Sequence, residues 1–161
     1  MSIVDDILAS YRRPRQVIAR KLADGPREDR ALATVMGACA MAFVAQWPSL
    51  SRAAALDPSV PLQARMGAAL LASVFLLPLI LYALSLISHG VARSVGGRGS
   101  AFASRMALFW AMLAIAPLML LHGLTRGFLG DGLQAGVLGV LVLAVFLWMW
   151  LSMLMQAHRG A

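Results

Sequence analysis

The sequence predicts an all-α membrane protein: a polytopic helix bundle of four transmembrane helices, preceded by amphipathic helices at the N-terminus. Hydrophobic residues make up 60% of the 161 residues and charged residues 13%, against about 45–50% and about 25% in soluble globular domains. Charges are also missing from four long runs, which are bounded by Arg30 and Arg52, Arg65 and Arg93, Arg105 and Arg126, and Asp131 and Arg159. Each run reaches the roughly 20 residues that a helix needs to cross a bilayer.

The four spans are expected near residues 31–49, 66–89, 104–124 and 133–156. The first is rich in Ala and Gly, so its insertion depends on length and packing, whereas the fourth is almost wholly Leu, Val, Met, Phe and Trp. Residues 31–161 are therefore assigned to one transmembrane domain and residues 1–30 to a leader that precedes it. Small residues four apart permit close helix contacts; they are Ala33/Gly37, Ala68/Ala72 and Gly132/Gly136.

The leader has the pattern of two short amphipathic helices. Ser2 is suited to cap the first, whose apolar side chains fall on one stripe at helical spacing. Pro14 suits the first turn of the second, and Gly25-Pro26 ends it. An apolar stripe beside basic residues is typical of a helix in the headgroup plane. The alternative is that the stripe docks on the protein's own spans, and both arrangements can hold together.

The distribution of basic residues predicts the orientation. With the N-terminus in the cytoplasm, the inside segments hold eleven of the fourteen Lys and Arg residues, and the outside loops hold only Arg52, Arg65 and Arg126. Cytoplasmic loops carry the Lys/Arg excess. We therefore expect a multi-pass protein of a bacterial inner membrane with both termini in the cytoplasm. The outer loop from Pro48 to Arg65 is expected to be ordered but not helical throughout.

Two prolines, Pro78 and Pro117, fall near the middle of their spans and are expected to kink them, because each frees a backbone carbonyl. Trp110 is expected near the inner interface. Trp148 and Trp150 lie deeper in the fourth span and favour a contact with lipid or another protein. The residues expected to contact lipids or partners are Arg12, Arg13, Arg15, Arg20, Lys21, Arg98, Trp148 and Trp150.

The sequence offers little for catalysis. Membrane enzymes and pumps use ionisable groups at depth, and charged residues are missing from all four runs. His89 and His158 end spans on the expected inner side and are candidates for a haem or metal, but a terminal histidine more often faces the headgroups. We therefore expect no enzyme activity, no cofactor and no metal. A nucleic-acid partner is not expected either, because the basic residues lie between apolar runs instead of forming one face.

Three stretches resemble the bacterial branch of the Yip1 family. They are Tyr11-Arg12-Arg13-Pro14-Arg15, the loop Gly96-Gly97-Arg98-Gly99-Ser100 after Ser88-His89-Gly90-Val91-Ala92-Arg93, and the span with Ala107-Leu108-Phe109-Trp110 and Ala116-Pro117-Leu118. The resemblance implies a multispanning protein with a cytoplasmic N-terminal region. Eukaryotic members are trafficking adaptors that bind small GTPases and shape membranes. The family usually has five spans and a larger cytoplasmic domain, so the present chain departs from it in both respects.

Three functions follow as hypotheses. The first is a non-enzymatic adaptor or scaffold, Yip1-like, that binds anionic lipid headgroups and other integral membrane proteins or itself. The second is a small accessory subunit of an energy-transducing or transport complex, with the Trp-bearing fourth span as the docking face. The third is a carrier or channel for an uncharged solute. A stoichiometric complex that co-purifies with the chain would favour the accessory subunit, and a lone monomer or homo-oligomer would favour the adaptor.

Overall fold

The computed structural model describes residues 2–159, and every regular element in that range is helical. The leader forms α1 (Ile3–Ser10) and α2 (Pro14–Ala23). The remaining elements are α3 (Glu28–Leu56), α4 (Leu62–Leu71), the π-helical turn η1 (Ala72–Leu76), α5 (Leu77–Ser94), α6 (Ala101–Ala114), α7 (Ala116–Leu129) and α8 (Leu133–Arg159). The all-α class is confirmed.

Three of these helical segments are each long and apolar enough to cross a membrane: Glu28–Leu56, Leu62–Ser94 and Leu133–Arg159. The fourth candidate is the bent pair α6 and α7, which passes the same criterion when taken as one span. The chain is therefore a membrane-embedded helix bundle with up to four spans. The helices extend several residues past the expected boundaries, because their last turns continue beyond the apolar core of each run.

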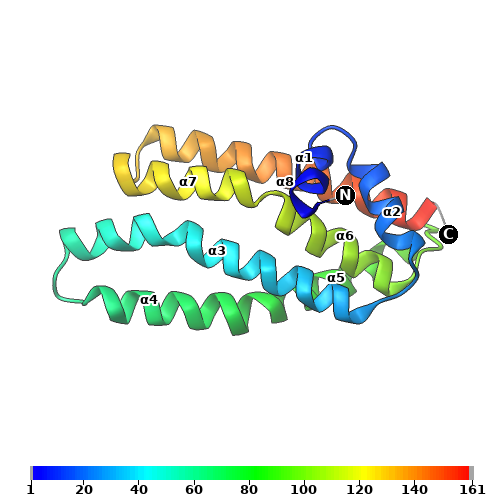
Figure 1. The fold of residues 1–161 in the computed structure, drawn as a ribbon, viewed down its shortest axis with the longest axis horizontal. Coiled ribbons are helices and arrows are strands. Elements are labelled where there is room, and N and C mark those ends of the chain that lie inside the picture. Colours follow the sequence, from blue (N-terminus) through cyan, green and yellow to red (C-terminus); the bar gives the residue numbers. More distant parts are fainter. Residues whose placement is uncertain (1, 160–161) are drawn as a thin grey trace.

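The elements lie roughly along one long axis, with two distinct ends (Figure 1). We call the end that holds α2, the α5–α6 loop (residues 95–100) and the last turn of α8 the terminal end. The hairpin end holds the α3–α4 loop and the α7–α8 turn. The α3–α4 loop is shorter than the segment expected to be irregular, because α3 continues through Pro48 to Leu56. Within this loop Ser59 donates hydrogen bonds to Asp57 and holds the pKa of that carboxyl below its ordinary value.

The segment Leu62–Ser94 stays helical through Pro78 by passing through the π turn η1 just before it. Pro78 lacks an N–H, so the regular pattern of backbone hydrogen bonds cannot continue past it. In the π turn the Leu77 N–H bonds to the Ala72 carbonyl instead. At this level Gln46 of α3 donates a hydrogen bond to the buried Ser73 hydroxyl, at 3.1 Å, which gives α3 and η1 a polar contact.

The other mid-span proline lies at a sharp bend. The axes of α6 and α7 differ by 43°, and the break falls at Ile115, two residues before Pro117. On the terminal side of the bend, α6 packs against α3, α5 and α8 and against both leader helices. On the hairpin side, α7 packs mainly along α3. The bend thus separates a central helix from a peripheral one.

The closest helix contact is made by glycines other than those expected. A Cβ atom on Gly123 of α7 would lie 1.7 Å from the carbonyl oxygen of Ala45, and one on Gly127 would lie 2.4 Å from Pro48. By contrast, a Cβ on Gly132 or Gly136 would meet nothing within 4 Å. The two glycines, four residues apart, that allow α7 to pack closely on α3 are therefore Gly123 and Gly127. Within this chain the expected pair Gly132/Gly136 closes no helix contact.

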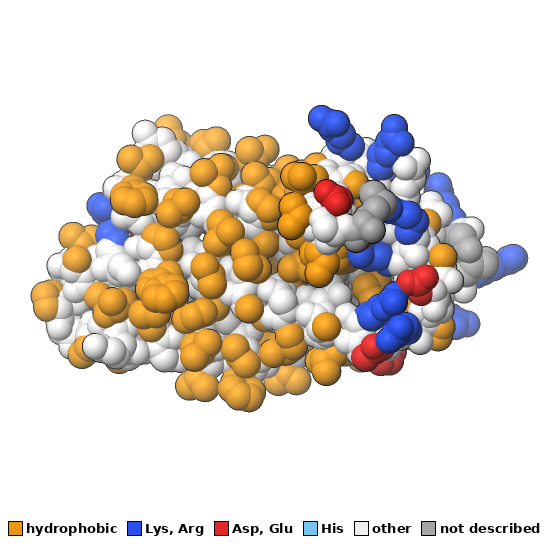
Figure 2. All heavy atoms as spheres, viewed as in Figure 1, with side chains coloured by type: hydrophobic (Ala, Val, Ile, Leu, Met, Phe, Trp, Pro, Cys, Tyr) orange, Lys and Arg blue, Asp and Glu red, His pale blue; other side chains and the backbone are white. Residues whose placement is uncertain are grey.

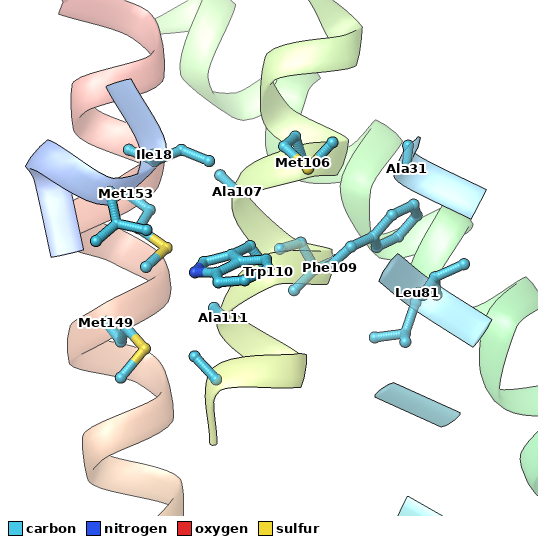
Figure 3. Close-up of a cluster of buried hydrophobic side chains, with 14 of the residues drawn as sticks. Ile18, Ala31, Leu81, Met106, Ala107, Phe109, Trp110, Ala111, Met149 and Met153 are labelled. Carbon is cyan, nitrogen blue, oxygen red and sulfur yellow. The ribbon is translucent and has the colours of Figure 1, made fainter. Parts of the chain in front are cut away.

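The hydrophobic core lies toward the terminal end and centres on α6 (Figure 3). Trp110 lies toward Ile18 of α2 and Met153 of α8, while Phe109 lies on the side of Leu81 of α5. The Phe109 ring also meets Tyr82 edge to face, with ring centroids 4.9 Å apart. One core therefore joins the leader to the spans.

Candidate functional site at the terminal end

The two leader helices behave differently. In α2 the side chains of Val17 and Ile18 are fully buried, and the helix packs mainly against α8 and also against α6. In α1 the side chains of Ile3, Val4 and Leu8 are each more than 60% exposed. Of the two arrangements expected for the leader, docking on the protein's own spans thus describes α2. The outer face of α1 remains an exposed apolar stripe.

Tyr11, at the end of α1, ties the leader to the bend in the third span. Its hydroxyl donates a hydrogen bond of 2.8 Å to the carbonyl oxygen of Ala114, the last residue of α6. That carbonyl would ordinarily receive the N–H of Leu118, but at the bend this N–H bonds to Ile115 instead. Burial raises the pKa of the Tyr11 hydroxyl above its ordinary value, so the phenol is protonated and donates this hydrogen bond. The leader therefore satisfies a carbonyl that the bend leaves free.

Trp110 lies under the leader, not at a lipid interface as expected. Only 3% of its surface is exposed. The indole N–H donates to the Ser10 hydroxyl at 3.0 Å, and the Lys21 ammonium lies 3.5 Å from the ring centroid. The surface that Trp110 contacts is that of α1 and α2, because the leader covers this side of α6.

The expected cationic contacts fall into two groups. Arg20 and Lys21 form ion pairs with Asp6 of α1, so they hold the two leader helices together. The side chains of Arg12, Arg13 and Arg15 are exposed, and within residues 2–159 none of them forms an ion pair. Figure 2 shows Lys and Arg side chains gathered at the terminal end, with hydrophobic side chains over much of the remaining length.

Arg98 is exposed in the α5–α6 loop, and its backbone N–H donates to the carbonyl of His158 at 3.3 Å. The glycines of this loop are required by close packing on α8. A Cβ atom on Gly97 would lie 2.7 Å from His158 Nδ1, and one on Gly99 would lie 2.4 Å from the Ala157 carbonyl oxygen. The loop therefore packs tightly on the end of α8 and presents Arg98 outward.

His89 and His158, the two histidines expected on one side of the membrane, lie close together where this loop packs on α8. Their ring centroids are 5.6 Å apart, and the buried Ser104 hydroxyl lies between them, 2.9 Å from His158 Nε2 and 3.3 Å from His89 Nδ1. The Gly99 N–H donates to His158 Nδ1 at 3.1 Å. Nδ1 is therefore the acceptor and Nε2 carries the proton.

This tautomer limits what His158 can do toward Ser104. A histidine acting as base toward a serine must offer a free nitrogen lone pair to the hydroxyl. His158 instead presents an N–H to Ser104, and Ser104 is fully buried. Among residues 2–159 no group of three or more His, Cys, Asp or Glu side chains is placed to hold a metal ion. The arrangement suits a structural hydrogen-bonded contact among α5, α6 and α8.

The fourth-span tryptophans point to different surroundings. Trp148 is 49% exposed on the outer surface of α8. Trp150 is partly buried and stacks on Phe146, with ring centroids 5.8 Å apart, and its indole N–H has no hydrogen-bond partner in the described part of the chain. Trp148 is therefore presented to lipid or to another protein on the outer surface of α8, whereas Trp150 lines the space between α8 and α5.

Several residues of the terminal end carry roles that the sequence pattern did not indicate. Tyr11 falls at helical spacing on the apolar side of the leader, and nothing in the sequence indicates that its hydroxyl has a partner 103 positions away. Ser104 bridges two histidines, and Arg105 forms an ion pair with Glu28 at the start of α3. A polar residue just inside a span boundary, such as Ser104, was the one signal available.

The fold and the site together define a helical integral-membrane protein with a docked cationic leader. No protein-family model, curated protein or solved structure matches this chain.

Proposed function

We propose that this protein is a non-enzymatic adaptor of a bacterial inner membrane, Yip1-like, whose leader holds anionic lipid headgroups close to the bundle. The observation that carries the proposal is the exposure of Arg12, Arg13 and Arg15 on a leader docked against the spans. Each Lys or Arg near an anionic leaflet contributes about 1 kcal/mol. The exposed stripe of Ile3, Val4 and Leu8 supplies apolar surface beside them for the headgroup and acyl boundary.

The internal contacts of the leader support a rigid interaction surface. Lys21 and Arg20 engage Asp6, and Tyr11 and Ser10 bind α6, so the α1–α2 turn is held in one place. Positioning a cationic turn in this way lowers the entropy lost when lipid or a partner binds. Other integral membrane proteins would then contact this protein together with the anionic lipids that its leader holds.

The proposal includes the orientation in which both ends of the chain lie in the cytoplasm. The Lys/Arg excess at the terminal end supports it. Alkaline phosphatase, which is active only outside the cytoplasm, should be active when fused after Pro58 or Gly130 and inactive when fused after Gly97. Activity after Gly97 would overturn the orientation and the assignment of four spans.

The leader is tested with the full chain in bilayers containing spin-labelled phosphatidylglycerol or phosphatidylcholine. Electron paramagnetic resonance measures the selectivity of the protein boundary for each lipid. The wild type should prefer phosphatidylglycerol, and high salt should weaken the preference because it screens the charges. Replacing Arg12, Arg13 and Arg15 together by Gln should reduce the preference several-fold, whereas replacing all three by Lys should retain it.

Equal selectivity in the Gln variant and the wild type would overturn the lipid-binding role of the leader. The accessory-subunit function keeps one specific observation in its favour, the exposed Trp148 on the apolar surface of α8. A stoichiometric complex lost on Trp148→Ala would support that function instead. The solute-carrier function has less support, because Tyr11 bonds to the carbonyl freed at the Pro117 bend.

A further inference from the structure

We infer that the groove between α5 and α8 binds one acyl chain of an anionic phospholipid, with the phosphate of that lipid against Arg159. The inference rests on the proposed function in one respect, since it places the chain in a bilayer that contains anionic lipids. It goes further by assigning a single bound lipid to a site that does not include the leader.

The groove exists because α6 separates its two walls. Helices α5 and α8 each pack against α6 and scarcely contact each other. Between them lies a cavity of about 640 Å³, open on one side. Its walls are apolar over most of their length and include Leu84, Ile87, Val91, Leu151 and Leu154. In a bilayer such a groove is filled by lipid chains, because an empty one would forfeit the dispersion contacts of its lining.

The length of the groove matches one leaflet. It runs along α5 from Leu84 to Val95, which at 1.5 Å per residue is about 16 Å. Half of a hydrocarbon core of about 30 Å is about 15 Å. Exposed apolar side chains continue on this side to Val95, which is 80% exposed at the end of α5. The apolar surface on this side therefore ends near the α5–α6 loop.

The charge of the lining changes at that boundary. His158 and Arg159 line the terminal end of the groove, next to Gly96 and Gly97. The side chain of Arg159 is exposed and forms no ion pair within the described part of the chain. An apolar slot one leaflet deep with a guanidinium at its mouth is complementary to an amphipathic molecule with a phosphate head. A zwitterionic lipid such as phosphatidylcholine would fill the groove, but its phosphate is already paired with the cation of its own headgroup and is a weaker partner for Arg159.

The test is native mass spectrometry of the full chain in detergent with equal amounts of phosphatidylglycerol and phosphatidylcholine added. The wild type should retain one phosphatidylglycerol per chain, at least tenfold more than phosphatidylcholine. Ala92→Trp, which fills the groove, should reduce retention at least tenfold. Ala83→Trp makes the same change at an exposed position of α5 that does not line the groove, and should leave retention unchanged.

Arg159→Gln tests the contact with the lipid headgroup separately from the contact with the acyl chain. Because Arg159 is exposed, the substitution leaves the fold intact. It should remove the preference for phosphatidylglycerol while a lipid is still retained. Equal retention in Ala92→Trp and Ala83→Trp would overturn the groove, and an undiminished preference in Arg159→Gln would overturn the role of the guanidinium. Replacing Arg12, Arg13 and Arg15 by Gln should leave this lipid in place, so failure of the leader proposal and failure of the groove are distinguishable.

Discussion

The two halves of the third span have the same length and opposite environments. Both α6 and α7 contain 14 residues, and both are rich in apolar side chains. In α6, ten residues are buried, whereas in α7 only Ala116 and Gly123 are. The half at the terminal end is surrounded by five other helices, two of them from the leader, while the half at the hairpin end lies on the surface of the bundle.

The difference teaches that hydrophobicity alone does not say which part of a membrane helix faces lipid. Lipid and protein interior are both apolar, so the same residue types suit either side. What separates the halves is how each is held. The α6 half is fixed by side-chain hydrogen bonds from Tyr11, Trp110 and Ser104. The α7 half is fixed by the close backbone approach at Gly123 and Gly127.

The largest expected effect is on the α7 half. Gly123→Ala places a methyl group where the Ala45 carbonyl oxygen already lies, so α7 and α3 must separate. Such overpacking costs about 3 kcal/mol, more than the roughly 1 kcal/mol that Ala gains over Gly in a helix. The midpoint of thermal unfolding in detergent should therefore fall.

Gly136→Ala is the matched control, because a Cβ atom there meets nothing within 4 Å. It should leave the unfolding midpoint unchanged or raise it. If the two variants unfold alike, the glycine contact does not hold α7, and the contrast between the halves loses its explanation.

A smaller effect is expected on the α6 half. Tyr11→Phe removes the hydroxyl that bonds to the Ala114 carbonyl and leaves that acceptor without its partner, at a cost of about 1–3 kcal/mol. The loss should loosen the leader without unfolding the spans. Amide hydrogen exchange should accelerate in α1 and α2 and stay unchanged in α3.

Tyr82→Phe provides the comparison, since its hydroxyl makes no hydrogen bond within residues 2–159. Exchange in the leader should not respond to it. Exchange in α3 that rises as much as exchange in α1 would show that the bend, and not the docking of the leader, depends on Tyr11.

The sequence predicts much of the site's residue composition, but not how those residues are arranged. The cations of the leader and the loop at residues 96–100 were expected at one end, because charge and glycine content are visible in the sequence. The sequence did not show which of those cations form ion pairs and which remain exposed. Asp6 pairs with Arg20 and Lys21 and not with the three arginines nearer to it in sequence, because α2 folds back along α1. The depth of Trp110 suggested an interface, but not that the leader would cover it.

The sequence by itself determined the all-helical class of the protein, the approximate positions of its long apolar helices and the gathering of cations at one end. These depend on the length of apolar runs and on where charges interrupt them, and both are local properties of the chain. Tertiary structure alone decided that Tyr11 bonds to Ala114, that His89 and His158 share Ser104, and that Gly123 instead of Gly136 closes the bundle. It also decided that α6 lies between α5 and α8 and leaves a groove. The physical reason is that lipid does not favour one apolar face over another, so packing and a few hydrogen bonds choose which faces meet.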